Sequence, residues 1–340
     1  MKSLLVAAMV AASSIAVIST ASANPAFVDP IPDPTQTTQG TGPVQPSIVR
    51  AMAFSLQHPN AAPPGANDWQ CKLTPERPRP VVLVHGTWAN AYNDWAMVSS
   101  TLAARGHCVF ALNYGGGDSS SAISHLPGIN ATNGDLDLSA KQLSAFVDEV
   151  LARTGATQVE LVGHSQGVVV ARQYMRFGGG TDASDAARNK VAGLVSLAGP
   201  NSGTTFYGVE QLLSALNKAG VPAGEALAKT LGYSTIPQGT EREFIHALNA
   251  GAQTEPGVAY TAISTRYDEL VVPYQNSFLT AGPGATVRSF TIQDGCEIDF
   301  VGHINMSYDR RTVHYIVQGI ERDADLGPAP CDFATQYLVK

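Results

Sequence analysis

"QVELVGHSQGVVVARQYM", from Gln158 to Met175, decides the fold of this chain. Branched residues form a short apolar run that stops at Gly163, and a helical pattern begins after Gly167. Ser165 lies between the two glycines, in the spacing Gly-x-Ser-x-Gly. In a strand-to-helix turn this spacing places the serine on a sharp, exposed bend, whereas in other contexts it marks only a tight turn. The strand pattern before it and the helix pattern after it favour a nucleophilic Ser165.

The same alternation of strand and helix extends over most of the chain. Strands are predicted at 79–86, 108–114, 158–164, 191–199, 258–265 and 287–294, and helices at 93–106, 135–155, after Ser165 and at 304–322. Continuously apolar strands that alternate with helices are typical of a parallel sheet covered on both faces. The sequence therefore predicts one α/β domain over residues 68–340, with a mostly parallel sheet.

Residues 200–251 interrupt this alternation with three stretches of helical period, "YGVEQLLSALNKAG", "GEALAKTLG" and "EREFIHALNAG". Each ends in glycine, a common residue at helix C-termini. An inserted helical cap or lid and ordinary crossover helices that pack on the sheet both fit this pattern.

The N-terminal region has two parts before the predicted domain. Residues 1–23 carry one lysine, an apolar run and an Ala-Ser-Ala ending, which predicts a secretory signal peptide cleaved after Ala23. A membrane anchor is the competing interpretation, but the run is shorter than the roughly 20 residues that span a bilayer. Residues 24–67 are rich in proline and glycine and predict an extended arm with one short helix over "SIVRAMAFSL".

Composition narrows the class of partner. The net charge is −7 and the chain has no run of lysine and arginine, which argues against nucleic acid or anionic membrane as the main partner. The sequence has no HExxH, CxxC or acidic loop spacing typical of a metal site. We therefore expect no cofactor and no metal, and the sequence leaves the oligomeric state open.

Four cysteines, Cys71, Cys108, Cys296 and Cys331, lie beyond the predicted cleavage point. An even number in a chain bound for an oxidising compartment predicts two disulfides. Three pairings are open to four cysteines. We expect Cys71–Cys108 and Cys296–Cys331, because each pair is close in sequence.

A nucleophilic serine needs a histidine to take its proton, and in this fold class the acid and then the histidine follow the serine. Downstream of Ser165 lie His246, His303 and His314. His314 falls on the polar side of its predicted helix, and His246 lies among the predicted cap helices. His303 follows the last predicted strand on a loop, and we expect it to be the general base.

The acid of the site must orient the histidine and stabilise its protonated form. The late acidic residues are Asp268, Glu269, Asp294, Glu297 and Asp299. Asp268 follows a predicted strand, at the carboxyl end where catalytic groups collect in parallel sheets. Asp294 also ends a predicted strand and is the rival candidate.

Two backbone N–H groups should stabilise the oxyanion. One is expected from Gln166, the residue after the nucleophile, and the other from Thr87 in the loop after an early strand, where His85 is expected to be structural. The aromatic side chains of Trp88, Tyr92, Trp95 and Tyr114, with the 209–231 helices, are candidates for an acyl pocket or for core packing.

Five segments together carry a resemblance to a known family: "RPVVLVHGT", "GHCVFALNYG", "LVGHSQG", "ISTRYDELVVPY" and "IQDGCEIDFVGHINMSYD". From about Asp68 to its end the chain resembles the secreted class 2 lipases and esterases of actinobacteria. The resemblance implies an α/β-hydrolase fold and activity on carboxylic esters, including acylglycerols. Many members of the family have a second glycine after the nucleophile turn, where this chain has Val168.

The resemblance assigns the catalytic roles to Ser165, Asp268 and His303 and implies the disulfides Cys71–Cys108 and Cys296–Cys331. Separately, the threonine after the His-Gly pair resembles that of fungal lipases whose threonine hydroxyl adds a third donor to the oxyanion, which suggests the same role for the Thr87 side chain. The expected protein is a secreted, extracellular hydrolase of lipid or small-molecule esters, acting through an acyl-enzyme. An acyltransferase with the same triad is the alternative, followed by a peptidase and a non-catalytic binding protein of the same fold.

Overall fold

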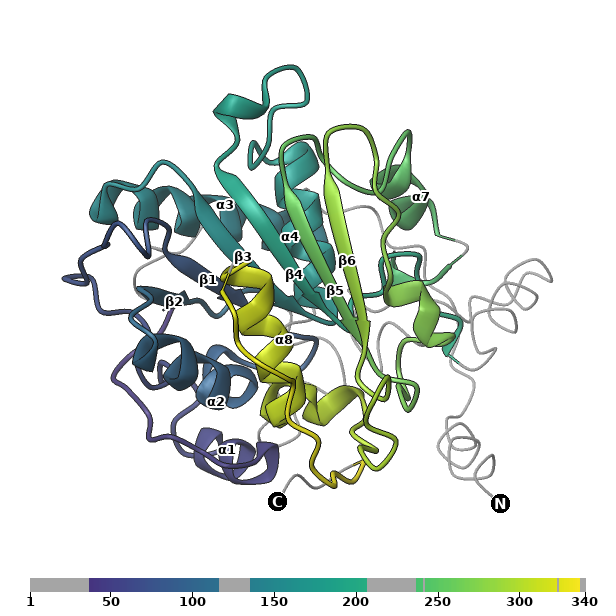
Figure 1. The fold of residues 1–340 in the computed structure, drawn as a ribbon. Helices are drawn as coiled ribbons and strands as arrows, with labels where there is room; N and C mark the ends of the chain where they lie inside the picture. The colour runs from purple at the N-terminus through teal and green to yellow at the C-terminus, as the bar shows by residue number, and fades with distance from the viewer. Residues whose placement is uncertain (1–36, 116–134, 207–236, 241, 323, 337–340) are drawn as a thin grey trace, which may run out of the picture. The chain divides into compact units, whose positions relative to one another are not determined.

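The computed structural model describes residues 37–115, 135–206, 237–240, 242–322 and 324–336 (Figure 1). All of them belong to one compact unit that spans residues 31–340. The predicted signal peptide lies outside the described residues. Within the described ranges, no helix is both long enough and apolar enough to cross a membrane.

A six-stranded sheet in the order β2-β1-β3-β4-β5-β6 forms the centre of this unit. Every neighbouring pair of strands is parallel. The strands are β1 (Val81–Val84), β2 (Val109–Ala111), β3 (Val159–His164), β4 (Val191–Leu197), β5 (Ala259–Ser264) and β6 (Thr286–Thr291). Each lies within a segment predicted as a strand or overlaps it, so the predicted parallel sheet is confirmed. Because all strands run the same way, their carboxyl ends meet at one edge, where the loops that follow them can share a site.

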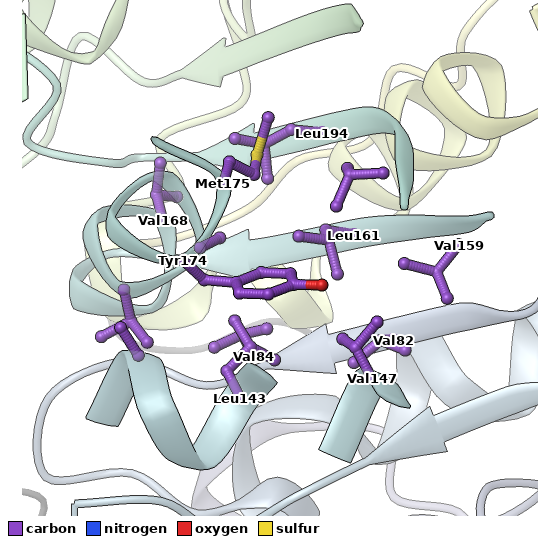
Figure 2. Packing of buried hydrophobic residues seen from close by; sticks show 14 of the residues in the cluster. Val82, Val84, Leu143, Val147, Val159, Leu161, Val168, Tyr174, Met175 and Leu194 are labelled. Atoms are coloured by element: carbon purple, nitrogen blue, oxygen red, sulfur yellow. The ribbon is translucent and has the colours of Figure 1, made fainter. Parts of the chain in front are cut away.

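Helices cover both faces of the sheet. On one face, α3 (Leu136–Thr154) and α4 (Gln166–Phe177) pack against alternate strand residues such as Val82 and Val84 (Figure 2). Figure 2 shows the ring of Tyr174 from α4 lying among these valines and Leu161. On the other face, α2 (Ala91–Ala104) and α8 (Arg310–Ile320) pack against the intervening strand residues. Burial of each such aliphatic side chain stabilises the fold by about 1.5–3 kcal/mol.

Side-chain caps set two helix starts that periodicity alone does not locate. Asn90 and Asn93 form a reciprocal capping box, so α2 begins at Ala91, before the predicted start at residue 93. The predicted last helix, 304–322, is split: a 3-10 helix, η8 (His303–Tyr308), precedes α8. The Asp309 carboxylate accepts a hydrogen bond from the Thr312 N–H (2.6 Å) and starts α8 there.

Residues 37–67, the described part of the predicted arm, lie against the domain. They contain α1 (Ile48–Ser55), which packs on α2. Ala51 is buried with Tyr92 and Tyr308, and the Tyr92 hydroxyl donates to the carbonyl of Pro43 (2.8 Å). This segment therefore adds a small apolar cluster beside α2.

Of the three helical stretches predicted in 200–251, the first two lie outside the described residues. The third corresponds to α7 (Glu243–Asn249), which contacts α4. The buried guanidinium of Arg172, on α4, donates to the carbonyls of Leu248 (3.3 Å) and Gln253 (2.9 Å). These bonds attach α7 and the segment after it to the helix that follows Ser165.

The two predicted disulfides are confirmed. Cys71 pairs with Cys108, which directly precedes β2, and Cys296 pairs with Cys331. Cys296 lies between β6 and His303, so the second disulfide joins the chain ahead of the predicted base to the C-terminal segment.

Candidate active site

Ser165 occupies the sharp turn between β3 and α4. Its backbone has φ 52° and ψ −122°, a conformation that L-residues adopt at a cost of about 1–3 kcal/mol. The flanking glycines make the turn sterically accessible, as predicted. A Cβ on Gly163 would lie 2.8 Å from the Val168 nitrogen, and one on Gly167 would lie 2.1 Å from the Val84 carbonyl oxygen. Neither position accepts a larger residue without movement of the backbone.

Val168, where the chain departs from the family pattern, is fully buried at the start of α4. It packs against Gly199, just beyond β4. A Cβ on Gly199 would lie 2.6 Å from the Val168 Cβ. The missing side chain at Gly199 therefore provides the space that Val168 occupies.

His303 and Asp268 meet at the carboxyl edge of the sheet. Nδ1 of His303 lies 3.0 Å from both carboxylate oxygens of Asp268. Asp268 is itself fixed, because its Oδ1 accepts hydrogen bonds from the N–H groups of Leu270 (2.9 Å) and Val271 (2.7 Å). This geometry leaves Nε2 of His303 directed away from the carboxylate, and no described residue forms a hydrogen bond with it.

The electrostatic surroundings of His303 favour a retained proton. The side chain is only 2 % exposed, and this burial lowers the pKa, but the charge and hydrogen bond of Asp268 outweigh it. The carboxylates of Glu269 and Asp94 add to the effect of Asp268. The net result is a His303 pKa raised above 6.5.

The other candidates for the base and the acid do not form this pair. His246 is exposed on α7, and His314 is half-buried on α8. Asp294 is exposed and pairs with Arg266 (2.6 Å). Glu269, which the sequence marks only as a neighbour of Asp268, accepts a hydrogen bond from the backbone N–H of His303 (2.8 Å).

Ser165 and His303 open onto one cavity of about 250 Å³. Thr87 and Trp88 contribute the side of the cavity that belongs to the loop after β1. The remaining wall is largely apolar and includes Ile48, Met52, Phe206, Leu270, Val271 and Ile304. Of the aromatic residues predicted for an acyl pocket, Trp88 lines this cavity, whereas Tyr92 and Trp95 are buried in the core and Tyr114 stacks on His85. Residues 209–231 lie outside the described part of the chain.

The two predicted oxyanion residues are linked through their side chains. The Thr87 hydroxyl donates to the side-chain oxygen of Gln166 (2.9 Å), and the Gln238 amide donates to the same oxygen (3.0 Å). The hydrogen bond between Thr87 and Gln166 joins the loop after β1 to the nucleophile turn. It also engages the single hydroxyl proton of Thr87, so that proton is directed to Gln166 and away from a third oxyanion contact. His85, expected to be structural, is fully buried with its pKa lowered by burial to about 4.

The sequence analysis assigns no role to two residues of this region, although one of them, His164, lies within the Gly-x-Ser-x-Gly motif. Asp94 on α2 and His164 at the end of β3 are both buried and hydrogen-bonded to each other (2.9 Å). Asp94 falls in a predicted helix, where a charged residue ordinarily faces water. Only the three-dimensional arrangement shows that Asp94 lies beside the nucleophile turn.

Comparison with known proteins agrees with this geometry. The family described as "Lipase (class 2)" matches residues 78–315, which is well over half of the chain. The chain belongs to the class 2 lipase family. The match includes the nucleophile turn, Asp268 and His303, and ends within α8.

Curated relatives of this class 2 lipase family member include two described as triacylglycerol lipase. One is from Pseudarthrobacter phenanthrenivorans and is 27 % identical over 211 residues, which cover 61 % of this chain and 56 % of the relative. The other, from Burkholderia plantarii, is also 27 % identical over 211 residues, covering 61 % and 49 %. The chain thus spans about half the length of the curated relatives it matches.

Among solved structures, the class 2 lipase chain is similar to lipase B of Aspergillus fumigatus. The TM-score is 0.57 at 18 % sequence identity, over 79 % of this chain and 57 % of that one. At this identity the likeness concerns the fold alone. With the parallel sheet and its two helical layers, it establishes the α/β-hydrolase fold that the sequence predicts.

Proposed function

We propose that this protein is a serine hydrolase that cleaves carboxylic esters of lipid type. The observation that carries the proposal is the shared cavity of Ser165 and His303, with Asp268 on the far side of the imidazole. Membership of the class 2 lipase family and the triacylglycerol lipases among its relatives support the choice of ester. The apolar cavity wall suits an acyl chain.

In this mechanism Nε2 of His303 takes the hydroxyl proton of Ser165 as Oγ attacks the ester carbonyl carbon. Asp268 holds the ring in the required tautomer and stabilises the imidazolium that forms. The backbone N–H groups of Thr87 and Gln166 stabilise the oxyanion. The alcohol leaves with the proton from His303, and a water molecule activated by the same nitrogen then hydrolyses the acyl-enzyme.

We also propose that the protein acts outside the cell. Two disulfides support this location, because such bonds persist in oxidising compartments. The Ala-Ser-Ala sequence at residues 21–23 supplies a cleavage site for a signal peptide. Mass spectrometry of protein recovered from the culture medium should show an N-terminus at Asn24, and retention of the whole protein in the cell would contradict the proposal.

Substitution of the nucleophile tests the central claim. Oxidised wild-type protein should react with a fluorophosphonate probe and hydrolyse p-nitrophenyl esters. Ser165→Ala removes the attacking oxygen, so labelling should disappear and hydrolysis should fall by at least about 10³-fold. Ser184→Ala, at an exposed serine outside the cavity, is the matched control and should behave as wild type. Undiminished labelling or hydrolysis by Ser165→Ala would remove the proposed mechanism.

A further inference from the structure

Asp94 is a buried carboxylate, 2 % exposed, in the first turn of α2. A carboxylate near a helix N-terminus is favourable by itself. The recorded partners of Asp94, however, lie on other segments. Its Oδ2 accepts a hydrogen bond from the N–H of Gly86 (2.8 Å), in the loop after β1, and Oδ1 accepts from the Ser307 hydroxyl (3.2 Å), in η8. The third partner is Nδ1 of His164, at 2.9 and 3.0 Å from the two oxygens.

His164 extends this connection to the predicted base. Its Nε2 lies 3.1 Å from the backbone carbonyl oxygen of His303, and the two imidazole rings are 5.0 Å apart. Both nitrogens of His164 thus face oxygen acceptors. These two contacts hold the His164 ring between the Asp94 carboxylate and the backbone of His303.

We propose that Asp94 and His164 form a second buried Asp–His pair that positions the three catalytic segments relative to one another. This inference rests on the proposed ester hydrolysis. Asp94 holds the loop that supplies Thr87, His164 directly precedes Ser165, and His164 with Ser307 fixes the segment of His303. Asp94 and His164 also line the cavity of Ser165 and His303. We assign them a positioning role because their side-chain hydrogen bonds go to Gly86, Ser307 and His303 and to each other.

The pair also acts on His303 through its charge. The charged and titratable groups around the imidazole of His303 are Asp268, Glu269, Asp94 and His164. The carboxylate of Asp94 contributes to the raised pKa of His303. Loss of that carboxylate should therefore lower the pKa of the base as well as loosen the segments around it. A residue with a purely structural role would change only stability.

Asp94→Asn tests this proposal in the full-length, oxidised protein. The substitution keeps the size of the side chain and removes its charge. We expect kcat for a p-nitrophenyl ester to fall about 10- to 100-fold with KM within twofold, because misplacement of catalytic groups slows the chemical step. We also expect the acidic limb of the kcat/KM profile to move to lower pH.

Glu321→Gln is the matched control. Glu321 is also a buried carboxylate, but it pairs with Arg105 (2.6 Å) at the opposite end of α2, roughly 16 Å along the helix from Asp94. Its removal is expected to lower stability and leave the acidic limb in place. Ser307→Ala keeps the Asp94 charge, so it should also leave that limb unchanged.

The outcomes separate this inference from the proposed function. Wild-type protein that fails to react with the fluorophosphonate would contradict the hydrolase itself. Reactive wild type together with an Asp94→Asn variant of unchanged kcat and acidic limb would overturn the role of the pair. If Asp94→Asn does not accumulate as folded protein, His164→Gln is measured instead. A decrease in its kcat of at least 10-fold at constant KM supports the proposal, and an unchanged kcat overturns it.

Discussion

At the scale of single residues, the nucleophile turn depends on what is missing. Ser165 keeps its strained φ because Gly163 and Gly167 lack a Cβ that would otherwise meet the backbone of α4 and β1. The Gly-x-Ser-x-Gly motif predicts both contacts correctly, since only a residue without a Cβ fits at position 163 and at position 167. Sequence spacing alone does not decide whether Asp268 or Asp294 pairs with His303. Both aspartates end strand segments, and only the fold determines which carboxylate reaches the ring.

The raised pKa of His303 predicts the pH dependence of hydrolysis. The proposed base, His303, can accept a proton only when Nε2 is unprotonated, so kcat/KM should rise with pH through a pKa above 6.5. Asp268→Asn removes a charge and a hydrogen bond that raise this pKa, so the limb should move to lower pH while kcat falls by about 10⁴-fold. Initial rates between pH 5 and pH 9 measure both effects.

The control for this prediction is the histidine on α8. His303→Ala should abolish turnover, whereas His314→Ala should leave it near the wild-type value. An equal loss in the two variants would contradict the assignment of the base.

At the scale of elements, periodicity and apolar runs predict the strands to within about three residues. The central strands are buried on both faces and are therefore largely apolar, whereas the edge strand β6, TVRSFT, is mostly exposed or half-buried. Boundaries set by side-chain caps are harder to predict. The helix predicted over 304–322 is a 3-10 helix before Asp309 and an α-helix after it. The Asp309 carboxylate accepts a hydrogen bond from the Thr312 N–H and so caps the α-helix. The contribution of α1 to the cavity also has no sequence signal, since proline-rich flanks make its segment look like a leader.

This helix should influence acyl-chain preference. Met52 on α1 lines the cavity and is 37 % exposed, so a larger side chain there can enter the cavity without disturbing the core. Met52→Trp should lower the rate on p-nitrophenyl palmitate about 10-fold relative to p-nitrophenyl acetate, because the longer chain needs more of the apolar wall.

Val49→Trp is the matched control for this helix. Val49 lies three residues away on the same helix, is 53 % exposed and is not part of the cavity wall. The palmitate-to-acetate ratio should remain that of wild type in this variant. A parallel change in both variants would exclude a specific role for Met52.

At the scale of the whole molecule, family membership follows from motifs that extend along the chain from β1 to η8. The sequence is sufficient to predict both the fold and the family.

The pH dependence of stability is harder to predict from the sequence, because it depends on which carboxyl groups become buried. Burial and the nearby Asp309 raise the pKa of Asp299 to about 7. Its Oδ1 accepts a hydrogen bond from the Val301 N–H (3.0 Å), two residues before His303.

Asp299 should make the protein less stable as the pH rises. A folded-state pKa above the unfolded value gives stability at low pH that is lost as the pH rises toward about 7. Asp299→Asn keeps an acceptor for Val301 and cannot ionise, so its free energy of unfolding should increase relative to wild type between pH 5 and pH 8. Urea denaturation at both pH values measures the change.

Asp325→Asn, at an exposed carboxyl, is the control for this measurement and should follow the wild type at both pH values. A constant difference between Asp299→Asn and wild type across this range would show that Asp299 does not titrate there.

The contact of Val168 with Gly199 also constrains how this sequence can have changed over time. Because the two positions share one volume, a side chain at 199 is acceptable only after position 168 has become smaller. With valine at 168, even an alanine at 199 would require the Val168 side chain to move. The effect of a substitution at either position therefore depends on the residue at the other, beside the proposed nucleophile.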